Sequence, residues 1–329
     1  MSFLSDLPGH TLPNYSEDIS EDALFHYTDA NGLIGILQSK GIWSTAYYCT
    51  NDASELRAGR DVLTPVFRKK THEMERQEDS RVVTIRNRGV DIRQYAEKFE
   101  QRIINHSLHF VGVYVTCFCK PNNKEDFLHG LLSQWRAYGN DGGYALQFSR
   151  GRLQDYLVRL NEDLGLNYEV QDVYYSPDNP LKKDVVSHSE SFISSYVNFL
   201  DDIVNLNASD PKFRSPVQDL FEGPLESLLD YLIHTKNQHF FEESECRMSI
   251  VDAINEGGAL LPMFYFNRNG LVVPYVRTPK NYSIIDCVDW IVIGPGPRIG
   301  DRFNSVKQMV NRMGLDIEVR PSHIPLSRD

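Results

Sequence analysis

The pattern in this sequence that is best suited to catalysis or ligand binding consists of two carboxylates and a guanidinium at alternate positions. In the segment FFEESECRMSIV, strand alternation would place Glu243, Glu245 and Arg247 on one face and Cys246 and Met248 on the other. Burying charged groups on a strand face costs free energy, so such a face is expected to be exposed to water or to take part in function. The segment predicts either a cleft with catalytic carboxylates or a surface strand with a ladder of ion pairs. Its apolar flanks favour the cleft.

A second group, SQWRAYG, combines flat rings, a cation and small hydrogen-bonding groups. Trp135 and Tyr138 could stack on a heteroaromatic ring, and Arg136 could hold a phosphate. Ser133 and Gln134 could add hydrogen bonds to the same ligand. In the alternative, Trp135 anchors a loop to the core and Arg136 pairs with a neighbouring carboxylate. The residues alone favour neither interpretation.

A third group, LFHYT, lies where a predicted buried strand meets a helix that Asp29 could cap. His26 and Tyr27 point to opposite faces of this strand. Strand ends beside helix starts can form clefts that carry binding residues. The alternative is that His26 is a hydrogen-bonded core histidine and Tyr27 is ordinary packing, and this motif alone favours that alternative slightly.

The elements that must position these groups alternate between short apolar strands and amphipathic or charged helices. Strands are expected at 23–27, 42–47, 109–118, 143–148, 168–175, 245–251, 263–266 and 271–276. The SQWRAYG group is expected in a polar link between two strands, and the chain is expected to end as strand, helix, strand. The pattern predicts an α+β fold in one domain over residues 1–329, with a helical segment at 52–106 and a helical cap or insertion at 152–234.

The segment DWIVIGPGPRIGDRF has the strand, glycine loop and helix order of a dinucleotide site. Its glycine spacing departs from that of the known fingerprint. Pro295 and Pro297 also have no N–H to offer a pyrophosphate. The segment therefore predicts a rigid turn into a packing helix.

Composition narrows the class of protein. With 41% hydrophobic and 24% charged residues, the chain of 329 residues can bury a core without disulfides or metal. Its formal charge of -11 disfavours nonspecific nucleic-acid binding. Five cysteines without a CxxC pair predict reduced thiols and no metal site. No apolar run reaches about 20 residues and no signal peptide is recognisable, so we expect a cytoplasmic protein with no membrane segment.

The blocks LFHYT, NDASE, SQWRAYG and ESECR together resemble a large, mostly prokaryotic family of unknown-function domains. Its members carry L-x-H-Y-T, N-D-x-x-E, S-Q-W-x-x-Y-G and E-x-E-x-R motifs. That family in turn resembles a divergent branch of the ADP-ribosyltransferase superfamily, in which a histidine, an aromatic residue and a glutamate hold NAD. The resemblance implies an ADP-ribosyltransferase-like split mixed β-sheet with a helical insertion, and NAD as the substrate without a metal.

Carried onto this sequence, the resemblance implies that His26 hydrogen-bonds the adenosine ribose and belongs to the catalytic set. Glu245 would be the catalytic carboxylate and Glu243 the first acid of an E-x-E pair. One of Tyr48, Trp135 and Tyr138 would stack on nicotinamide, in one pocket with His26 and Glu245. The expected NAD contacts are His26, Tyr27, Thr28, Tyr48, Ser133, Gln134, Trp135, Arg136, Tyr138 and Arg247.

The expected activity is NAD-dependent transfer of ADP-ribose to a protein or nucleic acid, in a toxin or phage-defence effector that a partner protein could neutralise. A fixed carboxylate would stabilise the positive charge that develops on the ribose. Two alternatives remain open: an NAD glycohydrolase with water as the acceptor, and a noncatalytic module that binds nucleotides or proteins. The presence of both Glu243 and Glu245 argues against the noncatalytic module.

Overall fold

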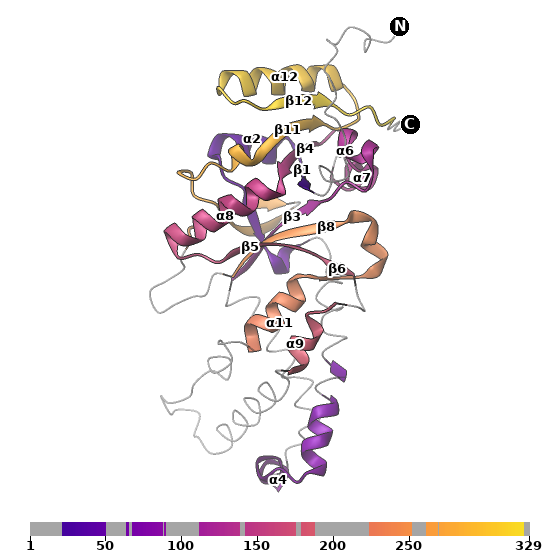
Figure 1. Cartoon of the computed structure of the whole chain (residues 1–329), viewed down its shortest axis with the longest axis vertical. Coiled ribbons are helices and arrows are strands. Elements are labelled where there is room, and N and C mark those ends of the chain that lie inside the picture. The colour runs from indigo at the N-terminus through magenta and orange to yellow at the C-terminus, as the bar shows by residue number, and fades with distance from the viewer. Residues whose placement is uncertain are drawn as a thin grey trace. The chain divides into compact units, whose positions relative to one another are not determined.

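The computed structural model describes the chain in segments. They are residues 22–50, 64–65, 68–87, 89, 112–138, 142–175, 179–187, 224–251, 261–268 and 270–325. These residues form an α+β protein with a mostly antiparallel sheet, which confirms the α+β class, while the ADP-ribosyltransferase-like sheet stays a prediction (Figure 1). Among the helices in these segments, none combines the length and the hydrophobicity of a transmembrane helix.

Contacts divide the chain into two compact units, which are described separately below. The first unit comprises Met1–Leu33, Cys119–Leu153 and Cys287–Asp329. The second unit comprises Ile34–Phe118 and Gln154–Asp286.

The sheet of the first unit has the strand order β12-β11-β4-β1. Strand β1 (Ala23–Thr28) pairs antiparallel along its whole length with β4 (Tyr144–Ser149), and β4 pairs antiparallel with β11 (Val288–Ile293). Strand β11 pairs in parallel with β12 (Glu318–Pro321). A parallel pair needs a long crossover, which helix α12 (Ile299–Arg312) supplies while it packs along β12 (Figure 1). The predicted strand, helix, strand ending is thus confirmed.

Two short helices, α6 (Lys124–His129) and α7 (Leu132–Tyr138), complete the first unit. The side chain of Asn123 caps α6 by accepting the backbone N–H of Asp126 at 2.9 Å, and Gly130 ends the helix with a φ of 79°. The SQWRAYG group lies between two strands, β3 (Val113–Cys119) and β4, as expected, but mostly in α7, so the expectation of a loop there is wrong. A helix of seven residues spans only two turns, which is too short for a clear helical periodicity.

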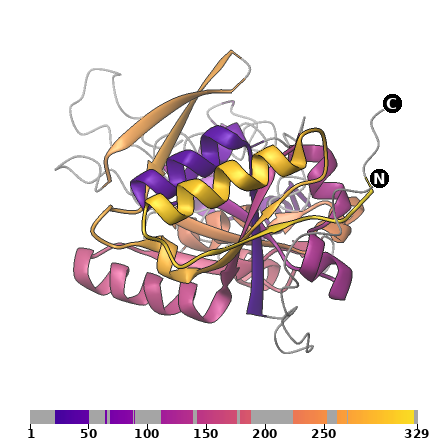
Figure 2. The same cartoon turned by 90° about the horizontal axis from the view of Figure 1, so that it is seen from above.

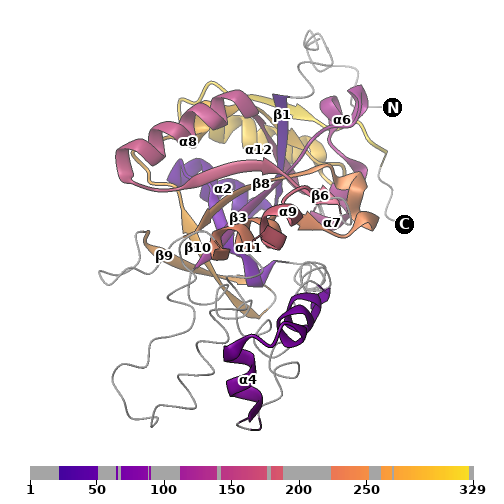
Figure 3. The ribbon, with the colours of Figure 1, turned by 60° about the horizontal axis from the view of Figure 1, so that its bottom comes forward.

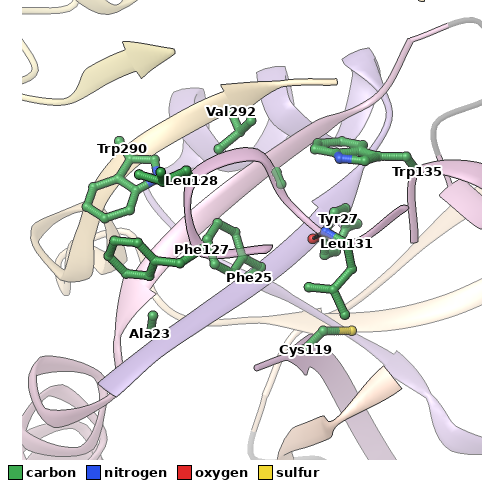
Figure 4. Packing of buried hydrophobic residues seen from close by; sticks show 11 residues of the cluster. Ala23, Phe25, Tyr27, Cys119, Phe127, Leu128, Leu131, Trp135, Trp290 and Val292 are labelled. Atoms are coloured by element: carbon green, nitrogen blue, oxygen red, sulfur yellow. Dashed lines mark hydrogen bonds between the residues drawn. The ribbon is translucent and has the colours of Figure 1, made fainter. Parts of the chain in front are cut away.

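One hydrophobic cluster in the first unit gathers around Tyr27 and Trp135 (Figure 4). The two rings meet edge to face with centroids 4.8 Å apart, and Phe127 and Trp290 meet in the same way at 5.1 Å. The cluster also contains Ala23, Phe25, Cys119, Leu128, Leu131, Ala145 and Val292. Three elements that are distant in sequence, β1, α7 and β11, are joined by this packing.

The sheet of the second unit has the strand order β9-β10-β2-β3-β8-β5. Strands β9 (Met263–Arg268) and β10 (Leu271–Arg277) form an antiparallel hairpin, seen as two orange strands in Figure 2. Gly270 adopts a φ of 87° in its turn, a conformation that glycine adopts without strain. The remaining strands are β2 (Trp43–Ala46), β3 (Val113–Cys119), β8 (Glu245–Val251) and β5 (Tyr168–Asp172).

Helix α2 (Ala30–Ser39) begins at Asp29, whose side chain accepts the backbone N–H of Gly32 at 2.8 Å. This confirms the predicted cap. Leu33, Ile36 and Leu37 form the buried face of this helix, whereas Ile34 is exposed.

Of the predicted helical segment 52–106, the structure describes helical residues 68–76 and α4 (Ser80–Asn87), and much of the rest lies outside the described residues. The helical cap or insertion expected at 152–234 stays a prediction, and the described elements of this segment are helices interrupted by short strands. They are α8 (Arg150–Leu164), β5, β6 (Tyr174–Tyr175), α9 (Lys182–Ser187) and α11 (Pro224–Ile233). Helices α9 and α11 pack together (Figure 3).

Candidate functional site

Three consecutive elements bring four charged side chains together in the second unit. Strand β7 (Thr235–Lys236) leads into the 3-10 helix η3 (Gln238–Glu243), and η3 leads into β8. Ser244 takes a left-handed conformation with a φ of 42°, which turns the chain between η3 and β8. Glu243 therefore ends the 3-10 helix and Glu245 begins the strand.

Glu245 and Arg247 form a buried ion pair with two-point geometry. Arg247 donates from Nε to Oε1 of Glu245 at 2.7 Å and from Nη2 to Oε2 at 3.2 Å. Its Nη1 donates to the carbonyl of Ile233 at 2.5 Å. Glu245 is 3% exposed and Arg247 is 1% exposed. The predicted alternative of a surface ladder is therefore wrong, because the ion pair lies in the interior.

Lys236 joins the second carboxylate to this pair. Its Nζ donates to Oε2 of Glu243 and to Oε2 of Glu245, both at 2.7 Å. The lysine side chain is 8% exposed, and its ammonium lies 5.2 Å from the centre of the Phe240 ring. Two carboxylates thus face two cations, so the formal charge of the group is zero. We call Lys236, Glu243, Glu245 and Arg247 the charge cluster.

The environment fixes the ionisation of the charge cluster. Burial raises the pKa of Glu245, but the charges and hydrogen bonds of Arg247 and Lys236 outweigh burial and lower it to about 2. Burial lowers the pKa of Lys236, but Glu245 and Glu243 raise it above its ordinary value. Around neutral pH, Glu245 is therefore an anion and Lys236 a cation.

The small parallel sheet of β6 and β7 contacts the charge cluster through Tyr175. Tyr175 pairs in register with Lys236, and its hydroxyl accepts the backbone N–H of Glu245 at 2.8 Å. Burial raises the pKa of this hydroxyl well above its ordinary value, so Tyr175 stays neutral. The same residue therefore fixes both the lysine and the start of β8.

Two of the predicted NAD contacts in the first unit are packed in its core. Tyr27 is buried, and its hydroxyl accepts the backbone N–H of Leu131 at 2.7 Å. Trp135 is 1% exposed, and its Nε1 donates to the carbonyl of His129 at 2.9 Å. These contacts match the alternative in which Tyr27 is ordinary packing and Trp135 is an anchor.

The other predicted site residues lie on several elements. Gln134 is buried in α7, while Ser133, Arg136 and Tyr138 of the same helix are exposed; His26 and Thr28 are half-buried in β1, and Tyr48 is exposed in the 3-10 helix Tyr47–Cys49. His26 and Trp135 belong to the first unit and Glu245 to the second. The pocket that was expected to join the three residues stays a prediction.

Lys236 is the residue of the charge cluster that sequence reasoning missed. It lies in the polar run HTKNQH, which has no strand or helix periodicity. The available signal was a lysine within ten residues of two closely spaced glutamates. Among the described residues, no group of three or more His, Cys, Asp or Glu side chains is arranged to hold a metal ion.

Comparison with known proteins finds a family model that matches part of the chain. No curated protein and no solved structure is significantly similar to the chain. The matching family model is described as a protein of unknown function (DUF2971), and it covers residues 134–248. It begins in α7 and ends in β8, so it includes Trp135 and the whole charge cluster. A DUF2971 domain is thus found at residues 134–248, in agreement with the unknown-function family expected from the motifs.

Proposed function

We propose that this protein cleaves NAD at the nicotinamide–ribose bond and transfers ADP-ribose to a macromolecular acceptor. The observation that carries the proposal is Glu245, a carboxylate that stays ionised and is held in one orientation by two cations beside a second carboxylate, Glu243. The spacing of these two acids matches the E-x-E pair of the superfamily that the sequence resembles. The matched family segment contains both residues.

The proposed reaction breaks the bond between C1′ of the ribose and the pyridinium nitrogen. The bonding electrons leave with nicotinamide, which departs as a neutral molecule, and positive charge develops on the ribose. A fixed anion stabilises this charge without reorganisation during the reaction. A nucleophile of the acceptor then bonds to C1′ and releases a proton.

The two carboxylates differ in accessibility, and this difference assigns their roles in the proposal. The side chain of Glu243 is 25% exposed, whereas Glu245 is buried. Glu243 is the carboxylate that acceptor and substrate can reach, so it would accept the proton of the acceptor nucleophile. Glu245 would supply a fixed negative charge beside Glu243 that stabilises the positive charge on the ribose.

The remaining proposed NAD contacts differ in whether their side chains are already bound to other groups of the protein. Arg247 donates to Glu245 and to the carbonyl of Ile233, so its guanidinium is committed to the protein. Arg136 is exposed on α7 and is the better candidate for the pyrophosphate. His26, Tyr48 and Tyr138 stay in the proposal as ribose and nicotinamide contacts.

The test is incubation of the purified protein with NAD that carries a label on the adenosine side, with and without a cell extract as acceptor. Labelled macromolecule supports transfer, and free ADP-ribose alone supports the glycohydrolase. Glu243→Gln is expected to lower turnover by about 10²–10³-fold. The matched control is Glu242→Gln, which changes an exposed carboxylate one position away. Equal turnover of both folded variants contradicts the catalytic role.

A noncatalytic interaction module is the second candidate. The observation that favours it is the neutrality and burial of the charge cluster, in which cations engage both oxygens of Glu245. Such networks also occur as purely structural features of protein interiors. This candidate predicts that NAD remains intact after prolonged incubation with the folded protein.

A further inference from the structure

We propose that Lys236 is a positioning residue that stabilises the charge of Glu245 and holds Glu243 beside it in its reactive orientation. This inference rests on the proposed function for its catalytic consequence. Its electrostatic part concerns the protein alone and can be tested without NAD.

The argument begins with the repulsion between two carboxylates in one site. Both Oε2 atoms lie 2.7 Å from the same lysine nitrogen, so the two carboxylates are close neighbours. Two carboxylates that share a site normally bind a proton between them, because like charges disfavour double ionisation. A cation between the two oxygens removes this tendency. Lys236 therefore offsets the repulsion between the two carboxylates by donating to both of them.

The two carboxylates depend on Lys236 to different degrees. Glu245 is also held by two donors of Arg247, at 2.7 Å and 3.2 Å. The hydrogen bond from Lys236 fixes Glu243, which is half-buried at the end of a short 3-10 helix. Loss of the lysine is thus expected to leave Glu245 in place and to release Glu243.

The lysine itself is fixed by its surroundings. It lies on β7, whose partner strand β6 contributes Tyr175 beside it, and its ammonium lies over the Phe240 ring. The side chain is nearly excluded from solvent. A lysine that is free to move loses much rotamer entropy when it binds, whereas this one is ordered by the fold. Lys236 therefore behaves as a preorganised clamp.

The first experiment measures the carboxyl titration of the glutamates by NMR in the wild type and in Lys236→Met. The pKa of Glu245 is about 2 in the wild type. We expect the titration midpoint of Glu245 to rise by on the order of one pH unit or more in the variant. Lys236→Gln, which keeps hydrogen bonding without charge, provides the same test if the methionine variant does not fold. Unchanged midpoints in a folded variant overturn the inference.

Lys307→Met is the matched control. Lys307 also lies over a phenylalanine, with Nζ 5.5 Å from the ring centre of Phe303, but it is exposed on α12. Its removal deletes the same charge and a similar ring contact. It should leave the glutamate titrations unchanged, so a shift in this variant would show a general effect of net charge.

The second experiment measures the pH profile of NAD turnover. Lys236→Met is expected to lower kcat by about 10-fold or more with little change in KM, and to move the acid limb upward in pH, while Lys236→Arg restores most of the rate. A wild type that does not consume NAD refutes the proposed function and leaves the titration result standing. A variant with wild-type kcat and pH profile overturns the positioning role even if NAD is cleaved.

Discussion

Replacement of Glu245 by glutamine tests the charge cluster most directly. The substitution keeps the size of the side chain and removes the charge, so Lys236 and Arg247 retain one carboxylate between them. A fall of the Glu245 pKa from 4.5 to about 2 corresponds to about 3 kcal/mol of folding free energy at 1.36 kcal/mol per pH unit. Breaking a buried ion pair typically costs about 3–5 kcal/mol. We therefore expect Glu245→Gln to destabilise the protein by about 3–4 kcal/mol at pH 7.

The pH dependence of this loss identifies its cause. The pKa of Glu245 is lower in the folded state, so its stabilisation is complete above about pH 4.5 and is lost as the pH falls towards 2. Denaturant unfolding of the wild type and Glu245→Gln at several pH values should give curves that converge in this window. Glu242→Gln, an exposed control, should cost about 0.5 kcal/mol or less. A loss for Glu245→Gln under about 1 kcal/mol at pH 7, or one unchanged down to pH 2, would refute the reasoning.

Two further predictions concern the core of the first unit. Trp135→Ala should lower the free energy of unfolding by about 3–5 kcal/mol, because it empties a fully buried site, and denaturant unfolding checks this value. Gly294→Ala should destabilise by about 1–3 kcal/mol, since its Cβ would lie 2.8 Å from the Trp135 ring and from the carbonyl of Gly143. Gly300→Ala should be neutral or slightly stabilising, because a Cβ at this position meets nothing within 4 Å. Equal melting temperatures for Gly294→Ala and Gly300→Ala would contradict the argument.

The strands of the fold could be predicted because each carries a local signal. Residues 23–28 and 288–293 are buried runs of apolar and β-branched side chains, and both form strands. Strands were also expected at 263–266 and 271–276, and these runs form β9 and β10. These features depend on residues close together in the chain, so pattern reasoning reaches them.

The placement of SQWRAYG could not be predicted in the same way. Trp135 is buried because Gly130 and Gly294 leave room for its ring, and both are glycines at which a Cβ would lie less than 3 Å from the indole. Gly294 lies over 150 positions away in sequence. The polar neighbours of Trp135 indicated a loop, whereas tertiary packing decided its position.

The candidate site was predicted only in part. Glu243, Glu245 and Arg247 were chosen for their charge and spacing, and the structure places them together. Lys236 could not be found by periodicity because β7 has two residues and pairs with β6, an equally short strand. Burial of the charges was also beyond the sequence, since it depends on β5 and β6 from a distant part of the chain.

The pairing of β6 with β7 has a consequence for the order in which this region folds. The members of the charge cluster are close in sequence, with Lys236 nine positions from Glu245, so their loop closes at low entropic cost. Strands β5 and β6, which help to bury the cluster, are distant from it in sequence. The backbone N–H of Glu245, for example, donates to the hydroxyl of Tyr175, 70 positions away. A contact between residues distant in sequence requires the closure of a long loop, which costs entropy. Strands β5 and β6 should therefore dock after the charged side chains have come together. We therefore expect the ions to pair first while they are still hydrated, and to lose their water only when β5 and β6 dock.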